Sequence, residues 1–111
     1  MSAQDNLSHA LFHGTIADLK PGDIIHPTQQ VISEKKEAYA TTNYSEAHSY
    51  ARIRAKNRNA LFGSVYEVEP LENDTTLQKK QSMISDQRKK PIRTSEQGFR
   101  VKRHVDWAKT L

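Results

Sequence analysis

The sequence predicts a small α+β fold in which several short antiparallel strands surround one main helix. Three observations support this fold class. Apolar and polar residues alternate along Gly63–Glu69 and Phe99–Trp107, as they do in half-buried strands. Only Glu46–Asn57 has apolar residues at helical spacing. The chain also lacks the regular alternation of strands and helices, with a glycine-rich turn, that is typical of a doubly wound sheet.

Two short strands and a turn are expected at the start of the chain. The apolar run Ala10–Phe12 predicts a first strand that extends from Ala10 to His13. Thr15 can cap the turn Ile16–Leu19, because its hydroxyl can accept a hydrogen bond from a backbone N–H. The Pro-Gly-Asp sequence at residues 21–23 is typical of a turn, and Asp23–His26 predicts a second short strand.

A loop, a strand and the main helix follow. The mostly polar stretch Gln29–Glu37 predicts a mobile loop, and the β-prone residues Ala38–Thr42 predict a strand. Ser45 is expected to cap the helix Glu46–Asn57, since a serine at this position can accept a hydrogen bond from the first turn. The apolar residues near one helix face are Ala47, Tyr50, Ala51 and Ile53.

Two long strands and an irregular connection complete the chain. Gly63–Glu69 places alternate residues on opposite faces, and Pro70 ends this strand. Glu72–Arg93 has no sustained period and is rich in Lys, Gln, Ser and Asp. A connection of this length in so small a protein is usually functional. Phe99–Trp107 alternates again and predicts the last strand.

Length and composition bound the kinds of protein that this chain can be. Its 111 residues suffice for one domain, which we expect over residues 10–111 after a flexible N-terminus at residues 1–9. The absence of cysteine excludes disulfides and thiol nucleophiles and fits a reducing compartment. The polar start Met1–Ser8 is unlike a secretory signal, and no apolar run is long enough to cross a bilayer. We therefore expect a monomeric cytoplasmic protein without a membrane partner.

The net charge of +4 is unevenly distributed along the chain. Residues 1–78 carry a charge of −3, and residues 79–111 carry +7. A basic end can attract a pyrophosphate or a nucleic acid, or it can be an ordinary solvated surface. One basic cluster has no aromatic residues between its cations, which argues against the stacking of nucleic-acid bases on it. It comprises Lys79, Lys80, Arg88, Lys89, Lys90 and Arg93.

A histidine followed at once by glycine ends the first expected strand. His13 can hydrogen-bond a sugar hydroxyl from this position, or its ring can be satisfied by a neighbouring carbonyl. Gly14 lets the backbone approach a ligand closely, because it has no Cβ. We therefore assign His13, Gly14 and Thr15 to a candidate ligand-binding site.

An aromatic residue and a carboxylate are candidates for the same site. Tyr39 lies in the strand before the helix, and its ring can stack on a flat heterocycle or pack in the core. Tyr50 can close the pocket from the helix, although core packing explains it better. Asp74 follows the strand Gly63–Glu69 and can stabilise a developing cation. Glu72 is the alternative acid, and Glu69 is a weaker alternative.

These side chains together suit cleavage of NAD at its bond between nicotinamide and ribose. Nicotinamide leaves this bond as a neutral molecule, so no acid has to protonate it. The transition state resembles an oxocarbenium ion, as in glycoside hydrolysis, and a carboxylate stabilises it. A histidine for the ribose, an aromatic ring for nicotinamide and one carboxylate are therefore sufficient.

Several other kinds of site are not expected. The histidines do not have the spacing of metal ligands, so the sequence predicts no metal site. They are His9, His13, His26, His48 and His104. A glycine-rich phosphate loop and a nucleophile elbow are also missing.

The chain resembles the rifampin ADP-ribosyltransferase (Arr) family from about Leu11 to Trp107. The resemblance rests on the order and spacing of several short segments. These are Leu11–Thr15 with Ala17–Asp23, Ala38–Thr41 with Ser45–Ala47, Val68–Pro70, Ile92–Thr94 and Val105–Trp107.

This resemblance implies a small, split antiparallel β structure and a catalytic set of His13, Tyr39 and Asp74. It implies transfer of ADP-ribose from NAD, as co-substrate, to a hydroxyl of a rifamycin antibiotic. Two alternatives stay open. One is a compact phage- or toxin-like relative that modifies a protein or nucleic acid, and the other is a basic binding module without turnover.

Overall fold

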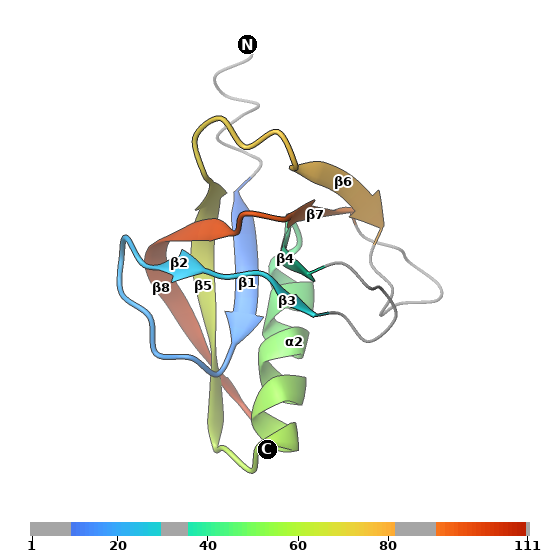
Figure 1. Ribbon diagram of the computed structural model, residues 1–111. Coiled ribbons are helices and arrows are strands. Elements are labelled where there is room, and N and C mark those ends of the chain that lie inside the picture. The colour runs from blue at the N-terminus through green and yellow to red at the C-terminus, as the bar shows by residue number, and fades with distance from the viewer. Residues whose placement is uncertain (1–9, 30–35, 82–90, 111) are drawn as a thin grey trace.

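The computed structural model describes residues 10–29, 36–81 and 91–110, which contain one helix and a sheet of antiparallel strands (Figure 1). This is the α+β class that the sequence predicts. In chain order the elements are β1 (Leu11–Thr15), β2 (Ile24–Ile25), β3 (Thr28–Gln29), β4 (Lys36–Thr41), α2 (Tyr44–Asn57), β5 (Phe62–Pro70), β6 (Gln78–Gln81), β7 (Pro91–Ser95) and β8 (Phe99–Lys109). No helix within the described ranges is long and apolar enough to cross a membrane.

The strands form a sheet with β1 near its centre. Their order is β2-β8-β5-β1-β4-β7-β6, and β3 pairs with β4 outside this path. All of these pairings are antiparallel. The longest pairing joins β5 and β8 from Phe62↔Lys109 to Pro70↔Phe99, and Figure 1 shows these two strands side by side.

The sheet is nearly divided between β1 and β4. On one side, β1 pairs with β5 over all of its residues. On the other side, its pairing with β4 is confined to Phe12↔Thr41. β4 instead pairs with β7 from Ala38 to Thr41, so β1 and β4 diverge beyond this single junction. We call the opening between them the split, and the candidate site lies there.

Small residues let α2 pack very closely on one face of the sheet. Ala47, Ala51 and Ala55 are spaced by four residues and are fully buried. A Cβ on Gly14 would lie 2.0 Å from the carbonyl oxygen of Ala47. A Cβ on Gly63 would lie 2.3 Å from that of Ala51. The two glycines therefore set how near the helix comes to β1 and β5.

A hydrophobic cluster lies on the other face of the sheet and includes the residues of β1 and β5 that point away from α2. Its members are Leu11, Ile25, Ala38, Ala40, Tyr66, Val68, Phe99 and Val101. The Tyr66 hydroxyl accepts a hydrogen bond from the Leu19 N–H and donates one to the Ala17 carbonyl, both at 2.8 Å. This phenol therefore fixes the segment between β1 and β2 over the cluster.

Most predicted elements are confirmed. β1, β2, β4, β5 and β8 coincide with the expected strands apart from their end residues. The turn at residues 21–23 is present, with Gly22 at a φ of 94°. The Thr15 hydroxyl accepts a hydrogen bond from the Ala17 N–H at 3.2 Å, as expected.

The predicted start of the helix is wrong. α2 begins at Tyr44, and its N-cap is Asn43 rather than Ser45. The Asn43 side-chain oxygen accepts a hydrogen bond from the Glu46 N–H at 2.8 Å. Asparagine caps helices at least as well as serine, so Asn43 starts the helix two residues before the predicted cap.

Both predicted irregular stretches are partly wrong. Gln29–Glu37 contributes residues to β3 and β4, and Glu72–Arg93 contains β6 and the start of β7. These polar strands form through pairing with neighbours in the sheet, which a local pattern cannot reveal. Residues 72–77 form an irregular connection between β5 and β6, as predicted. Residues 30–35 and 82–90 of these stretches lie outside the described residues, as does the N-terminal segment 1–9.

Candidate functional site

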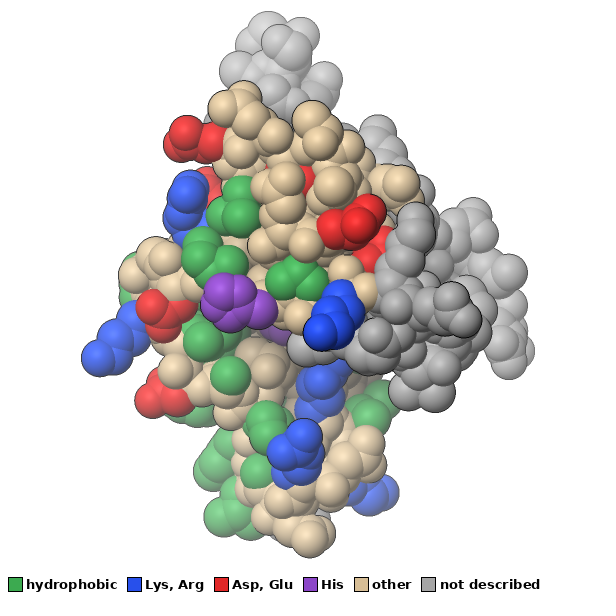
Figure 2. All heavy atoms as spheres, viewed as in Figure 1, with side chains coloured by type: hydrophobic (Ala, Val, Ile, Leu, Met, Phe, Trp, Pro, Cys, Tyr) green, Lys and Arg blue, Asp and Glu red, His purple; other side chains and the backbone are tan. Residues whose placement is uncertain are grey.

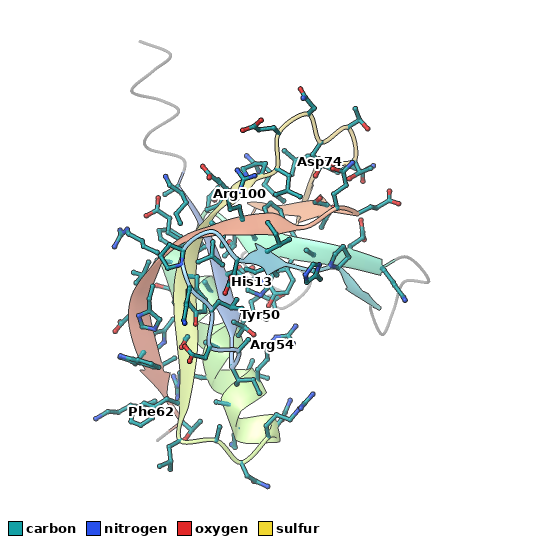
Figure 3. All side chains as sticks on the ribbon, turned by 60° about the vertical axis from the view of Figure 1, so that its left-hand side comes forward. His13, Tyr50, Arg54, Phe62, Asp74 and Arg100 are labelled. Carbon is teal, nitrogen blue, oxygen red and sulfur yellow. The ribbon has the colours of Figure 1, made fainter. Side chains whose placement is uncertain are left out.

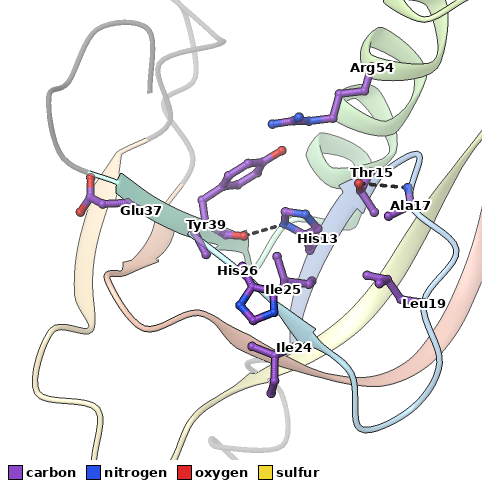
Figure 4. A pocket seen from close by; sticks show the side chains of 11 residues that line it. His13, Thr15, Ala17, Leu19, Ile24, Ile25, His26, Glu37, Tyr39 and Arg54 are labelled. Carbon is purple, nitrogen blue, oxygen red and sulfur yellow. Dashed lines mark hydrogen bonds between the residues drawn. The ribbon is translucent and has the colours of Figure 1, made fainter. Parts of the chain in front are cut away.

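A pocket of about 240 Å³ lies in the split, between β1, β2, β4 and the helix (Figure 4). Apolar side chains and several polar groups line it together, as in many binding sites for small molecules. The lining residues are His13, Thr15, Ala17, Leu19, Ile24, Ile25, His26, Glu37, Ala38, Tyr39 and Arg54. The volume is below the range of about 300–1,000 Å³ for sites that enclose drug-sized ligands, so this pocket suits one end of a larger ligand.

His13 bridges the split at the point where the backbone pairing has ended. Its Nδ1 lies 2.8 Å from the Tyr39 carbonyl oxygen. Because a carbonyl can only accept, Nδ1 carries the proton and Nε2 is left with a lone pair. Burial, with a smaller contribution from the Arg54 charge, lowers the pKa of His13 to about 4. The imidazole is therefore neutral at pH 7 and presents a hydrogen-bond acceptor.

Tyr39 is surrounded by rings and a guanidinium group. Its ring centroid lies 4.9 Å from that of His13 and 4.7 Å from that of Tyr50. The Tyr39 hydroxyl is 3.5 Å from the Gly14 carbonyl oxygen, to which it donates. Burial raises the pKa of Tyr39 to about 12, so the phenol stays protonated.

Arg54 is the cation of this site. Its guanidinium carbon lies 5.8 Å from the centroid of the Tyr39 ring, a cation–π distance. The side chain is exposed at the helix surface and lines the pocket from above in Figure 4. Sequence reasoning missed this residue. The available signal was its spacing, four residues after Tyr50 on the same helix face.

The structure does not bring Asp74 into the pocket. In Figure 3 its label lies at the upper end of the molecule, apart from His13 and Arg54. The Asp74 carboxylate accepts hydrogen bonds from the Thr76 N–H, at 2.8 Å, and from the Ser95 hydroxyl. Burial opposes ionisation, but these bonds hold the pKa of Asp74 below its usual value. Asp74 thus joins the connection after β5 to the end of β7, a structural role.

The alternative acid predicted from the sequence lies outside the pocket lining too. Glu72 is exposed in the connection after β5. Glu69, further back along the chain, is 3.6 Å from the Arg100 guanidinium. Neither acid is among the residues that line the pocket with His13.

Two other carboxylates lie nearer to the site. Glu37 lines the pocket and is buried, although its carboxylate points away from His13 in Figure 4. Glu46 is buried in the first turn of α2, and its charge contributes to the raised pKa of Tyr39. Its Oε1 has no hydrogen-bond partner in the part of the chain that the structure describes. Both residues were missed in the sequence, because each is a glutamate among other polar residues and nothing there marks it as part of a site.

The other predicted binding residues have different positions. Thr15 lines the pocket, whereas Gly14 faces α2, so its missing Cβ serves helix packing rather than ligand approach. The Tyr50 ring packs against the Tyr39 ring, and Tyr50 is not part of the pocket lining. The structure therefore brings His13, Thr15 and Tyr39 together around one cavity.

The buried His13 should make stability depend on pH. Its pKa falls from 6.5 in the unfolded chain to about 4 in the folded protein. Between these values the unfolded chain binds the extra proton, so folding is favoured most above pH 6.5 and less as pH falls. The free energy of unfolding should drop by about 2 kcal/mol from neutral pH to about pH 5.

Urea unfolding at these two pH values measures this loss. A matched His13→Gln variant has no titratable group at this position. Its free energy of unfolding should therefore fall by about 2 kcal/mol less over the same pH interval. Equal pH dependence in the two proteins would show that His13 titrates normally.

Within the described residues, no group of three His, Cys, Asp or Glu side chains could hold a metal ion. Comparisons with protein-family models, with curated proteins and with solved structures found no match.

Proposed function

We propose that the pocket binds the nicotinamide riboside end of NAD and that the protein is an ADP-ribosyltransferase. The observation that carries this proposal is the split, across which His13 and Tyr39 meet at one cavity with Arg54 at its rim. The resemblance to the rifampin ADP-ribosyltransferases implies a split antiparallel structure of this kind. The divergence of β1 from β4 supports it.

Each lining group suits a part of this ligand. The Nε2 lone pair of His13 can accept a hydrogen bond from a ribose hydroxyl. The apolar floor that includes Leu19, Ile24 and Ile25 can exclude water from the glycosidic bond. Arg54 can bind the pyrophosphate through its planar guanidinium, which would move it off the Tyr39 ring and free that ring for nicotinamide.

The reaction needs one negative charge near the ribose carbon. The bond between the ribosyl C1′ of NAD and nicotinamide breaks, and its electron pair leaves with neutral nicotinamide. The oxygen of an acceptor hydroxyl forms the new bond to C1′ and releases its proton to solvent. We assign the stabilising carboxylate to Glu37, because it lines the pocket and lies two residues before Tyr39 on the same strand. The proposal requires this carboxylate to turn toward the pocket when NAD binds, since it points away from His13 in Figure 4.

A rifamycin hydroxyl is the first acceptor to test, because the family resemblance implies it. The assay incubates the protein with NAD and rifampin and follows nicotinamide release together with the mass of the antibiotic. A mass gain of one ADP-ribose supports this acceptor. Nicotinamide release without modified rifampin would instead point to water or a macromolecule as the acceptor.

Arg54 should contribute strongly to NAD affinity. Arg54→Ala is expected to raise the dissociation constant for NAD about tenfold, because a charge-assisted hydrogen bond to phosphate is lost. Isothermal titration calorimetry measures this change. Arg58→Ala is the matched control, since Arg58 is an exposed cation at the end of the same helix and outside the pocket lining. Equal effects of the two substitutions would contradict the proposed contact.

A second candidate function is NAD binding without turnover. It is favoured by the direction of the Glu37 carboxylate, away from His13, and by the remote position of Asp74. Under this alternative NAD binds and stabilises the protein, but no nicotinamide appears over hours. Release that depends on Glu37, tested with Glu37→Gln, would exclude it.

A further inference from the structure

A second surface with unusual composition lies on another side of α2 from the pocket. Two adjacent hollows share Arg52 and run between α2 and the paired ends of β5 and β8. Their lining residues are His48, Ser49, Arg52, Ile53, Lys56, Phe62, Asp106, Trp107, Lys109 and Thr110. We call this surface the α2–β8 face. It shares no residue with the pocket in the split.

Large apolar side chains are exposed on and beside this face. Trp107 is 59% exposed, and Phe62, Ile53 and the adjacent Leu61 are exposed as well. Figure 2 shows hydrophobic side chains gathered with Lys and Arg at the lower end of the molecule. Because exposed apolar surface is unfavourable in water, a patch of this kind is typical of an interaction site.

The indole of Trp107 is held in place by its neighbours. Its ring lies 4.4 Å from His104 and 6.2 Å from Phe62, measured between centroids. These contacts restrict the side chain while most of its surface remains accessible. A fixed and exposed indole is a good stacking partner, since little side-chain entropy is lost when a flat ligand binds.

The charges around Trp107 are mainly positive. Arg52, Lys56 and Lys109 line the hollows and are all exposed. Asp106 is the acid among the lining residues, and the Tyr44 hydroxyl donates a hydrogen bond to it. That bond, followed by one from the Trp107 N–H, lowers the pKa of Asp106. The carboxylate therefore stays ionised, but it is outnumbered by the three cations among the residues that line the hollows.

We propose that the α2–β8 face binds single-stranded nucleic acid, with a base stacked on Trp107 and phosphates on Arg52, Lys56 and Lys109. Exposed aromatic rings beside cations are the combination by which proteins bind single strands. A duplex hides its base faces within its own stack, so the indole selects an unpaired strand. This surface differs from the basic cluster at residues 79–93, which has no aromatic residues.

The hollows favour a nucleic acid over a lipid surface. Ser49, His48 and Thr110 add hydrogen-bonding groups between the cations, and these suit sugar hydroxyls and base edges. The proposal is also independent of NAD, because the two sites have no lining residue in common.

Intrinsic fluorescence tests the stacking directly, because Trp107 is the only tryptophan of the chain. The full protein is titrated with oligothymidine and with oligouridine, each of about 12 nucleotides. Saturable quenching of the indole emission is expected with at least one of them, and weaker quenching with a duplex of the same length. The absence of quenching with both single strands overturns the proposal.

A charge reversal tests the phosphate contacts. Arg52→Glu should weaken binding about tenfold or more and make the dependence of log K on log salt shallower by about 0.7. Lys20→Glu makes the same change of charge at an exposed residue in the connection before β2. It should leave binding within about twofold of the unaltered protein. Equal losses with both substitutions would show only a general charge effect and would overturn the assignment to this face.

Two further readouts exclude other occupants. Analytical ultracentrifugation detects a second copy on the face, and a dimer that Trp107→Ala dissociates would overturn the proposal. Sedimentation with anionic vesicles detects lipid binding. Vesicle binding that oligonucleotides do not compete would likewise overturn it. Circular dichroism checks the fold of each variant, and Trp107→Ala should fold normally because the indole is mostly exposed.

Discussion

Gly14→Ala should lower the free energy of unfolding by about 3 kcal/mol or more. The added methyl group would lie 2.0 Å from the Ala47 carbonyl oxygen and 2.7 Å from the Ala51 nitrogen. Both atoms belong to the backbone of α2, so no side chain can rotate to make room. The helix would have to move away from β1, and the packing of the alanine stripe would be lost.

Urea denaturation at neutral pH measures this loss. Gly22→Ala is the control, because nothing lies within 4 Å of a Cβ there and its only cost comes from a φ of 94°. That cost is about 1 kcal/mol. If the two variants were equally stable, the close approach of α2 to β1 would be wrong. A larger loss of stability in Gly14→Ala than in Gly22→Ala would show that steric conflict with α2, and not the loss of glycine flexibility, is the cause.

His13→Ala should reduce nicotinamide release from NAD about a hundredfold, through loss of a positioned hydrogen-bond acceptor. The substitution also removes the bond to the Tyr39 carbonyl that spans the split. NAD affinity should fall in parallel, since the ribose loses its partner. Steady-state kinetics and calorimetry measure the two effects separately.

Two matched variants make the role of His13 testable. His13→Gln can still donate to the Tyr39 carbonyl, so it should keep more of the stability than of the activity. His26→Ala removes the other imidazole of the pocket lining, which is exposed, and should change nicotinamide release less than fivefold. A larger effect at His26 than at His13 would refute the assigned geometry.

The sequence was sufficient to predict the elements that carry strong local patterns. β5 and β8 have alternating sequences and end near Pro70 and Trp107, where expected, although Gly63–Tyr66 of β5 are buried on both faces. The helix was also predicted, but its start was misplaced because Asn43 and Ser45 are both suitable caps. β6 has the polar sequence Gln-Lys-Lys-Gln, so only its pairing with β7 defines it as a strand.

The candidate site was predictable only in part, for a related reason. His13 and Tyr39 stand out locally, and the neighbouring positions of β1 and β4 bring them together. Arg54 and Glu37 look like ordinary surface charges in the sequence. Asp74 is a suitable acid by its place in the sequence, but its hydrogen bonds to Thr76 and to Ser95 of β7 hold it outside the pocket. Convergence in space depends on long-range pairing, which a single sequence does not display.

Because β1 and β4 pair only at Phe12↔Thr41, their junction is a weak point of the sheet. Few main-chain hydrogen bonds join β1 to β4. The hydrogen bond from the His13 imidazole to the Tyr39 carbonyl is therefore an important link between the two strands. A compound that fills the pocket and contacts both β1 and β4 would stabilise the same junction. Thermal-shift screening of metabolite collections should therefore find its natural occupant by a raised melting temperature, whatever chemistry follows.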